Sequence, residues 1–195
     1  MDYTTLTNVK QALDATETTD DTLLSRLITE ASRAIDRYVS GNMQMTDYFK
    51  AETLTDERGF GLIGASGNLL YFPKKPTLSA VTAFAWRSRP WEDWQTMALN
   101  EINLANNSVV AWSVGVVRGK VEVKLTYSGG LGANTAALPA EIINATDLLT
   151  VRFYRELKSG LGDSIGVVEL GTLQYTKAWP VRFIKLLAPY KRVTP

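Results

Sequence analysis

The chain has 195 residues, of which 45% are hydrophobic and 21% are charged, a composition typical of a folded globular protein. It contains no cysteine and no histidine, which excludes disulfides, thiolate metal sites, histidine-ligated zinc and the Ser-His-Asp and Cys-His classes of enzyme. The formal charge is +1, from 21 basic and 20 acidic residues, and this balance argues against a protein whose main task is to bind nucleic acid. An enzyme that uses carboxylates, Lys, Tyr or Mg²⁺ is still open, but most common catalytic designs are excluded. We expect a non-enzymatic protein that uses no metal or cofactor.

No stretch of the sequence approaches the roughly 18 consecutive apolar residues that a membrane helix requires. The first ten residues lack a basic region followed by an apolar run, so we expect no secretory signal. The sequence predicts a protein that is made in the cytoplasm and does not enter a membrane.

The first part of the chain is predicted to be helical. Thr5 or Thr7 can cap a first short helix, and Asp20 or Asp21 can cap a longer one that ends at Gly41. In the longer segment, apolar residues recur every three or four positions, which defines one amphipathic face. They are Leu23, Leu24, Leu27, Ile28, Ala31, Ala34, Ile35, Tyr38 and Val39.

The hydrophobic period then changes to that of β-strands, with aromatic and β-branched runs separated by Gly, Asn and Pro. The strands we expect are Thr46–Thr55, Leu69–Phe72, Leu78–Trp86, Ile102–Leu104, Val109–Val117 and Lys120–Tyr127. The last alternates most regularly, and a turn at Arg118-Gly119 would join it to the strand before. Residues 46–135 are therefore predicted to form a β-rich insertion, a small sandwich or barrel.

Helix returns at Pro139 and is expected to end at Gly160, and a final short helix is expected after Pro180. The glycine-rich stretch between these helices suits an arm that becomes ordered only on docking. The predicted fold class is α+β. Its helical bundle is formed by the N- and C-terminal segments, residues 1–45 and 136–195, with the β-rich insertion between them.

The segment Gly59–Gly64 matches the pattern G-x-G-x-x-G, but the helix and the acidic residue that a dinucleotide site needs do not follow it. Arg58–Ile63 also echoes the start of an RNA-recognition pattern, yet Ala65 stands where a base-stacking aromatic is required. We interpret the segment as a flexible glycine-rich loop tip.

The most unusual local feature is the segment Trp86–Trp94, which places three tryptophans, two arginines and a proline within nine residues. The tryptophans could fold back onto the core of the insertion. They could instead form a protein interface, because Trp and Arg dominate interface hot spots, or they could stack on a sugar or on single-stranded bases. The candidate interface residues here are Trp86, Arg87, Arg89, Trp91 and Trp94.

A second candidate surface lies in the last helix and the residues after it. Its basic residues could form a solvated helix end or could dock onto an acidic partner. The candidate residues are Trp179, Arg182, Lys185, Tyr190, Lys191 and Arg192.

Three pieces of the sequence also carry a family resemblance through their order and spacing. The first is Leu6–Leu13, followed by an acidic spacer and Asp20–Tyr38. The second is Val121–Gly130, which ends in a Tyr-x-x-Gly turn and is followed by Leu138–Ile142 at the start of a long helix. The third is Trp179–Arg192, with a proline before a short helix, a Leu-Leu pair, and a final tyrosine followed by two basic residues. Together they resemble the head-to-tail connector (adaptor) family of tailed bacteriophages, of the HK97 and SPP1 types.

The resemblance implies a structural subunit of the virion neck, assembled in the host cytoplasm as a homo-oligomeric ring, usually a dodecamer. Its partners would be the portal protein and a tail-completion or tail-terminator protein, and DNA would pass through the ring without sequence-specific binding. A near-neutral subunit suits a channel along which DNA must slide, because many contacts between basic side chains and phosphates would hold the DNA in place. The alternatives are another neck or tail-completion protein, a carbohydrate-binding module that uses Trp86, Trp91 and Trp94, and, last, an enzyme that uses carboxylates and Mg²⁺.

Overall fold

The structure is a computed structural model that describes residues 1–41, 45–105, 108–112, 114, 119–159 and 179–192. Within these residues the fold is α+β, with four α-helices and a seven-stranded antiparallel sheet. The predicted arm after Gly160 and the predicted turn at Arg118 lie outside the described residues.

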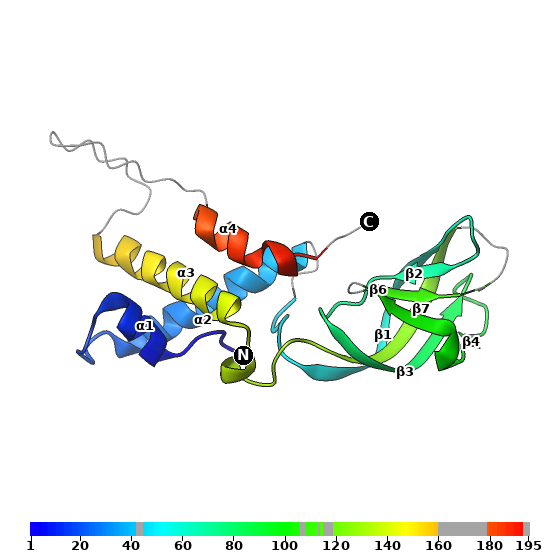
Figure 1. Ribbon diagram of the computed structural model, residues 1–195, viewed down its shortest axis with the longest axis horizontal. Helices are drawn as coiled ribbons and strands as arrows, with labels where there is room; N and C mark the ends of the chain where they lie inside the picture. Colours follow the sequence, from blue (N-terminus) through cyan, green and yellow to red (C-terminus); the bar gives the residue numbers. More distant parts are fainter. Residues whose placement is uncertain (42–44, 106–107, 113, 115–118, 160–178, 193–195) are drawn as a thin grey trace. The chain divides into compact units, whose positions relative to one another are not determined.

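The chain divides into two compact units (Figure 1). Met1–Asp47 and Thr135–Lys191 form the helical unit, and Tyr48–Asn134 with Arg192–Pro195 form the β unit.

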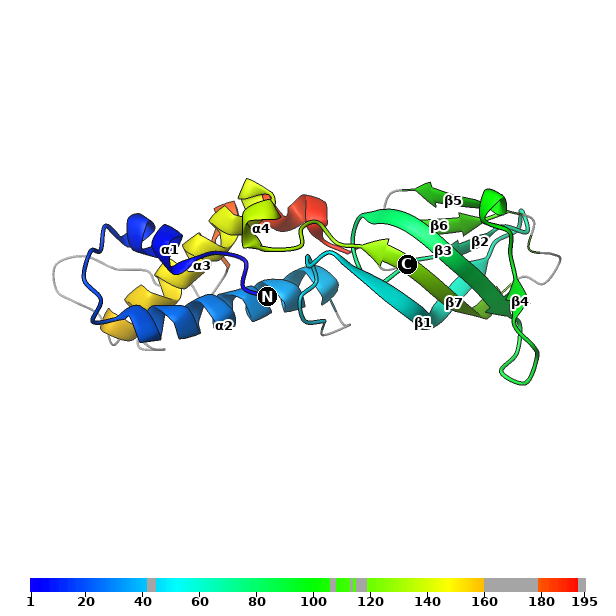
Figure 2. The same ribbon diagram turned by 90° about the horizontal axis from the view of Figure 1, so that it is seen from below.

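The helical unit is built around α3, which packs against each of the other three helices (Figure 2). The helices are α1 (Leu6–Leu13), α2 (Asp21–Ser40), α3 (Ala140–Ser159) and α4 (Val181–Leu187). Thr5 caps α1 as predicted, since its side chain accepts a hydrogen bond from the Asn8 backbone N–H. Asp20 is the cap residue of α2, but its carboxylate accepts hydrogen bonds from Tyr154 at 2.6 Å and Lys158 at 3.0 Å, on α3.

The predicted amphipathic face of α2 is confirmed. Its inward side chains include Leu24, Leu27, Ile28, Ala31, Ala34, Ile35 and Val39, which are all buried. Three polar residues of the same helix, Ser32, Asp36 and Ser40, are also fully buried. The hydrophobic period alone does not predict them, and one of them, Asp36, organises the polar contacts of this unit.

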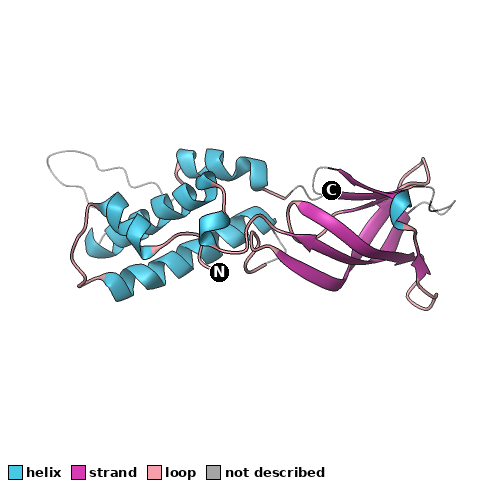
Figure 3. Cartoon of the chain, turned by 60° about the horizontal axis from the view of Figure 1, so that its bottom comes forward, coloured by secondary structure: helices cyan, strands magenta, loops and turns pink. Residues whose placement is uncertain are grey.

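The β unit contains one curled antiparallel sheet (Figure 3). Its strands are β1 (Glu52–Ile63), β2 (Leu69–Tyr71), β3 (Leu78–Arg87), β4 (Gln95–Thr96), β5 (Ile102–Ala105), β6 (Ser108–Ala111) and β7 (Gly119–Gly129). The strand order is β4-β3-β7-β1-β2-β6-β5, so β4 and β5 are the edges of the described sheet. The prediction that this region is rich in β-strands is thus confirmed. The described strands form a single sheet with two edges, not a two-sheet sandwich or a closed barrel.

The alternation predicted for the last strand is confirmed. In β7, Val121, Val123, Leu125 and Tyr127 are buried, whereas the residues between them face outward. They pack with Phe84 and other inward side chains of the sheet in the core of the β unit.

Strand β1 corrects two predictions. The strand runs from Glu52 to Ile63, not from Thr46 to Thr55, so most of the Gly59–Gly64 segment is strand and not a loop tip. A Cβ atom added at Gly61 would lie 2.6 Å from Cδ1 of Leu69, and one added at Gly59 would lie 2.6 Å from the Tyr71 hydroxyl. These glycines therefore allow close packing inside a curled sheet.

A β-bulge in β1 turns Glu57 toward the interior. Asp56 has a φ of +53°, and the pairing of β1 with β7 shifts register beside it. Glu57 is 6% exposed and accepts hydrogen bonds from the hydroxyls of Tyr71 and Tyr127, each at 2.7 Å. Burial and this carboxylate raise the pKa of both tyrosines well above the usual value, so they remain hydrogen-bond donors. The buried carboxylate thus joins β1, β2 and β7.

We predict that Gly61→Ala lowers the free energy of unfolding by about 2 kcal/mol, because overpacking a close contact costs roughly 1–3 kcal/mol. The added methyl would meet Leu69 at 2.6 Å, Val123 at 3.0 Å and the Leu70 carbonyl at 3.1 Å. Urea unfolding measures the change. Gly64→Ala is the matched control, since the nearest atom there is 4.0 Å away. Equal stability of the two variants would contradict the proposed packing.

Candidate functional site

Surfaces and polar networks are the candidate functional features of the described residues. No group of three or more carboxylates among these residues is arranged to hold a metal ion. None of the described helices is both long enough and apolar enough to cross a membrane.

The three tryptophans of the Trp86–Trp94 segment lie in different environments. Trp86 is 7% exposed and belongs to the core of the β unit. Trp91 is 77% exposed, with the Arg89 guanidinium 5.6 Å from its ring centroid. Trp94 is half-buried, and the Arg87 guanidinium lies 4.5 Å from its ring centroid. The tryptophans therefore do not form one continuous aromatic platform.

Arg87 is held from two sides. In addition to its contact with Trp94, it donates to Oε2 of Glu122 from Nε at 2.7 Å, and its Nη2 atom lies 2.6 Å from the same oxygen. Arg87 and Glu122 are opposite residues in the pairing of β3 with β7. This ion pair fixes the start of the Trp-rich segment on the sheet.

Trp94 belongs to a larger cluster on the outward side of β1 and β7. Two more cations approach its ring centroid, Lys124 at 5.5 Å and Arg58 at 5.8 Å. Next to them, Lys120 lies 4.0 Å from the ring centroid of Phe60, which is 60% exposed. We call this surface the basic-aromatic face. It consists of Arg58, Phe60, Leu62, Trp94, Lys120 and Lys124.

Sequence reasoning identified only Trp94 among these residues. A signal for the others was present, because the alternation of Lys120–Tyr127 predicts that Lys120 and Lys124 share the outward face. Arg58 and Phe60 were missed because the glycines beside them argued for a loop. Their facing partners depend on the register of β1 with β7, in which Arg58 is opposite Lys124.

The second candidate surface centres on α4. Trp179 stacks on Phe183 with a centroid distance of 4.7 Å and an angle of 11°. Both rings contact Tyr38 of α2, at 5.9 Å and 5.4 Å, and the Lys191 ammonium lies 5.2 Å from the Tyr38 ring centroid. Trp179 and Lys191 are therefore part of the packing between α2 and α4.

The remaining residues of this group differ in exposure. Arg182 and Lys185 are exposed on α4. Tyr190 is half-buried, and burial together with nearby Glu141 raises its pKa. Arg192 belongs to the β unit, where it donates to the Phe72 carbonyl at 2.6 Å. Within this group, Arg182 and Lys185 are the basic residues that form no ion pair with another described residue and lie next to exposed apolar side chains. These neighbours are Val181, 68% exposed, and Ile184, 38% exposed.

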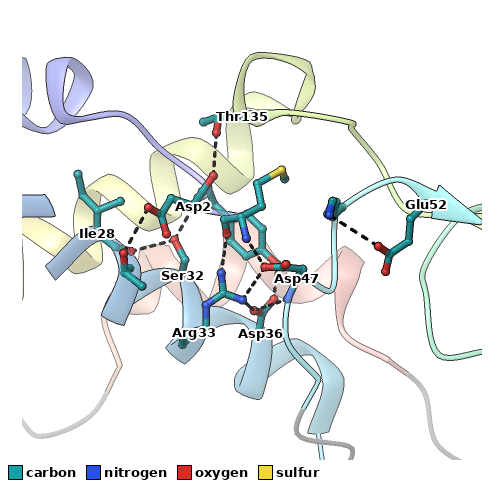
Figure 4. Close-up of polar contacts among 12 residues, drawn as sticks. Asp2, Ile28, Ser32, Arg33, Asp36, Asp47, Glu52 and Thr135 are labelled. Atoms are coloured by element: carbon teal, nitrogen blue, oxygen red, sulfur yellow. Dashed lines mark hydrogen bonds and ion pairs between the residues drawn. The ribbon is translucent and has the colours of Figure 1, made fainter. Parts of the chain in front are cut away.

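Asp36 is the centre of a polar network in the helical unit (Figure 4). It is fully buried and accepts hydrogen bonds from the Tyr3 hydroxyl, from Arg33 at 2.7 Å and from the Asp47 backbone N–H at 2.9 Å. Arg33 also contacts the Asp47 carboxylate at 2.7 Å and the Met1 carbonyl at 2.6 Å. The network holds the first residues of the chain and the segment after α2 against one face of that helix.

The charges of this network reinforce one another. Burial alone would lower the pKa of Arg33, but the carboxylates of Asp47 and Asp36 raise it above its usual value. Burial alone would raise the pKa of Asp47, but hydrogen bonds from the Met1 ammonium and Arg33 hold it below its usual range. Both groups are therefore charged at neutral pH.

Comparison with known proteins gives a likeness of fold. No family model and no curated protein matches the sequence. The structure is similar to a chain in the neck of an empty gene transfer agent particle computed with C6 symmetry. The TM-score is 0.52 and the identity is 16%, over 99% of this chain and 91% of that chain. It is also similar to a chain in the virion of a native gene transfer agent particle. There the TM-score is 0.51 and the identity is 17%, again over 99% of this chain and 91% of that chain.

We predict that Arg33→Met lowers the free energy of unfolding by about 2 kcal/mol, because it leaves the buried Asp36 without its cation. The estimate is below the range for fully buried pairs, since the Arg33 side chain is 26% exposed. Arg37→Met, on the exposed side of the same helix, is the control. Thermal and urea unfolding of both variants measure the effect, and a loss no larger than that of the control would contradict the role of the network.

A pH dependence follows from Asp47. A carboxylate whose pKa is lowered by folding stabilises the protein above its ordinary pKa, here 3.8, and this contribution is lost as the pH falls further. We predict that Asp47→Asn is less stable than the parent at pH 7 and that the difference shrinks below pH 3.8. Urea unfolding at several pH values tests this, and a difference independent of pH would contradict it.

Proposed function

We propose that the protein is a non-enzymatic structural subunit of the neck of a tailed phage or phage-like particle, a head-to-tail connector (adaptor). The observation that carries the proposal is the likeness of fold, over 99% of the chain, to a chain from the neck of a gene transfer agent particle. The three sequence pieces that resemble the connector family support it independently.

The packing of the helical unit adds support, because it brings two of these pieces together. Tyr38 ends the first piece, and Trp179 and Phe183 belong to the third. The three rings form one cluster between α2 and α4. We propose that residues 1–45 and 136–195 form the helical connector core as a bundle, and that residues 46–135 are a β-rich insertion into it.

In this proposal, copies of the chain form a ring beneath the portal protein, usually a dodecamer as in the family that the sequence resembles. The ring also contacts a tail-completion or tail-terminator protein and lets DNA pass without sequence-specific binding. The subunit is assembled in the host cytoplasm and ends in the virion neck.

The exposed side of α4 is the proposed docking surface for the portal or a neighbouring subunit. Val181 and Ile184 supply apolar contact, and Arg182 and Lys185 supply positive charge. The segment Trp179–Arg192 contains no acidic residue. An acidic partner surface with an apolar centre would complement it.

The carbohydrate-binding alternative loses support from the geometry of the Trp-rich segment. Trp86 is in the core and the Trp94 ring is surrounded by cations, so of these three tryptophans only Trp91 offers a largely exposed ring. Another neck or tail-completion protein remains the second candidate, since it would share the fold likeness. Portal binding distinguishes the two.

The test mixes the purified chain with the portal of the same particle and images the complexes by electron microscopy. We expect density for the chain beneath the portal, and we expect Arg182→Glu with Lys185→Glu to weaken portal binding by roughly tenfold or more through charge repulsion. Arg26→Glu with Arg37→Glu, a pair exposed on α2, is the matched control. Point changes are preferable to deleting the C-terminal segment, because Phe183 and Leu187 are fully buried.

Circular dichroism would establish that each variant is folded. A folded parent chain that binds neither portal nor tail components would overturn the connector proposal. Equal portal binding by the α4 variant and its control would remove α4 from the docking surface.

A further inference from the structure

The basic-aromatic face of the β unit exposes large apolar side chains to solvent and contains cations that form no ion pair with another described residue. Phe60 is 60% exposed and Leu62 is 46% exposed on the same strand. Among the described residues, neither Arg58 nor Lys120 forms an ion pair with a carboxylate. Arg58 is also directly opposite Lys124, whose ammonium pairs with Asp56 at 3.9 Å, and like charges in facing positions destabilise a sheet. These features indicate that a partner covers the face.

The apolar side chains decide which kind of partner fits. Contacts to duplex DNA are made largely by cations and polar groups to phosphates, and they leave exposed Phe60 and Leu62 without a role. Protein interfaces combine aromatic and apolar side chains with arginine. The complementary surface is therefore a protein surface that offers carboxylates beside apolar side chains.

The helical unit offers such a surface between α1 and α2. The segment Asp14–Asp21 contains four carboxylates and no basic residue. Asp21 is paired with Lys10 at 2.8 Å, and Asp20 with Lys158 at 2.9 Å. Asp14 and Glu17 form no ion pair within the described residues. These two carboxylates equal in number the two unpaired cations of the basic-aromatic face, Arg58 and Lys120.

This segment also borders an open groove of the helical unit. Its lining is mixed. Leu6 and Ala15 are apolar, Asp14 and Asp21 are acidic, and Lys10, which pairs with Asp21, is basic. The apolar side chains of Leu6 and Ala15 next to the unpaired Asp14 carboxylate complement exposed Phe60 and Leu62 with cations beside them.

The charges of the two units are also opposite in sign. The β unit contains ten basic and seven acidic residues, whereas the helical unit contains eleven basic and thirteen acidic residues. Opposite charges favour contact between unlike units of neighbouring copies.

We propose that the basic-aromatic face of one copy binds the Asp14–Asp21 segment and its groove on the next copy. Such a contact joins two different surfaces, and contacts of this heterologous kind generate a closed ring when the rotation between subunits closes. The inference rests on the proposed ring, and it names the two surfaces that hold neighbouring subunits together.

Cross-linking provides a direct test, because the chain has no cysteine of its own. The variants Lys120→Cys and Glu17→Cys are each made in the full chain, mixed and oxidised gently. Each variant carries a single thiol, so a disulfide between positions 120 and 17 can form only between copies. We expect this mixed dimer, identified by mass, to form at least several-fold faster than a mixed dimer of Lys120→Cys with Glu30→Cys. Glu30 is exposed on α2 and is the matched control.

Charge reversal provides the second test. Arg58→Glu with Lys120→Glu should weaken self-association by roughly tenfold, because two attractive exposed contacts become repulsive. Asp14→Asn with Glu17→Lys should weaken it similarly. The combined variant, with all four changes, should recover part of the loss, which a merely destabilised fold would not do. Analytical ultracentrifugation at low and high salt measures the association.

Three outcomes would overturn the inference. One is a rate of 120-to-17 cross-linking no higher than that of the control, including no cross-linking at all. Another is self-association of the combined variant that is as weak as that of the weaker of the two double variants. The third is duplex DNA binding that is lost in Arg58→Glu with Lys120→Glu while self-association is unchanged, which would assign the face to nucleic acid. All these measurements use the chain alone, so they can fail while portal binding holds, and the converse is also true.

Discussion

The helical unit depends on the neutralisation of one buried carboxylate. Asp36 is fully buried on α2, and an ionised carboxylate is costly to bury unless it is paired and hydrogen-bonded. Here Arg33, Tyr3 and the Asp47 backbone satisfy it. These three partners come from α2 itself, from the segment before α1 and from the segment after α2. The same contacts that make the burial tolerable therefore fix where the chain enters and leaves the long helix.

The helices could be predicted because their signals are local. The apolar residues of α2 repeat with the helical period, and the cap residues Thr5 and Asp20 lie where the sequence places them. The function of the Asp20 carboxylate could not be predicted, since its partners Tyr154 and Lys158 lie far along the chain. Hydrophobic periodicity shows which face of a helix is buried, but not which polar side chains are buried with it.

The β unit was harder to predict because its most informative residues violate strand preferences. Gly59 and Gly61 lie within a central strand, where glycine is ordinarily depleted. Asp56 adopts a left-handed conformation in the bulge, which shifts the alternation and turns Glu57 inward. By contrast, β7 contains no such interruption, and its alternation predicts its buried face correctly. The basic-aromatic face could not be read from the sequence alone, because it depends on the register of these two strands.

The connections of the β unit have a consequence for how the chain tolerates change. Asp47, just before this unit, is bound to Met1 and Arg33, and Thr135, just after it, donates to the Asp2 carbonyl at 2.7 Å. The residues that flank the β unit are thus both bound to the first two residues of the chain. The entropy of closing a long loop grows only slowly with its length, and here the ends are secured by contacts within the helical unit. We therefore expect the helical unit to tolerate changes in the length of the chain between Asp47 and Thr135.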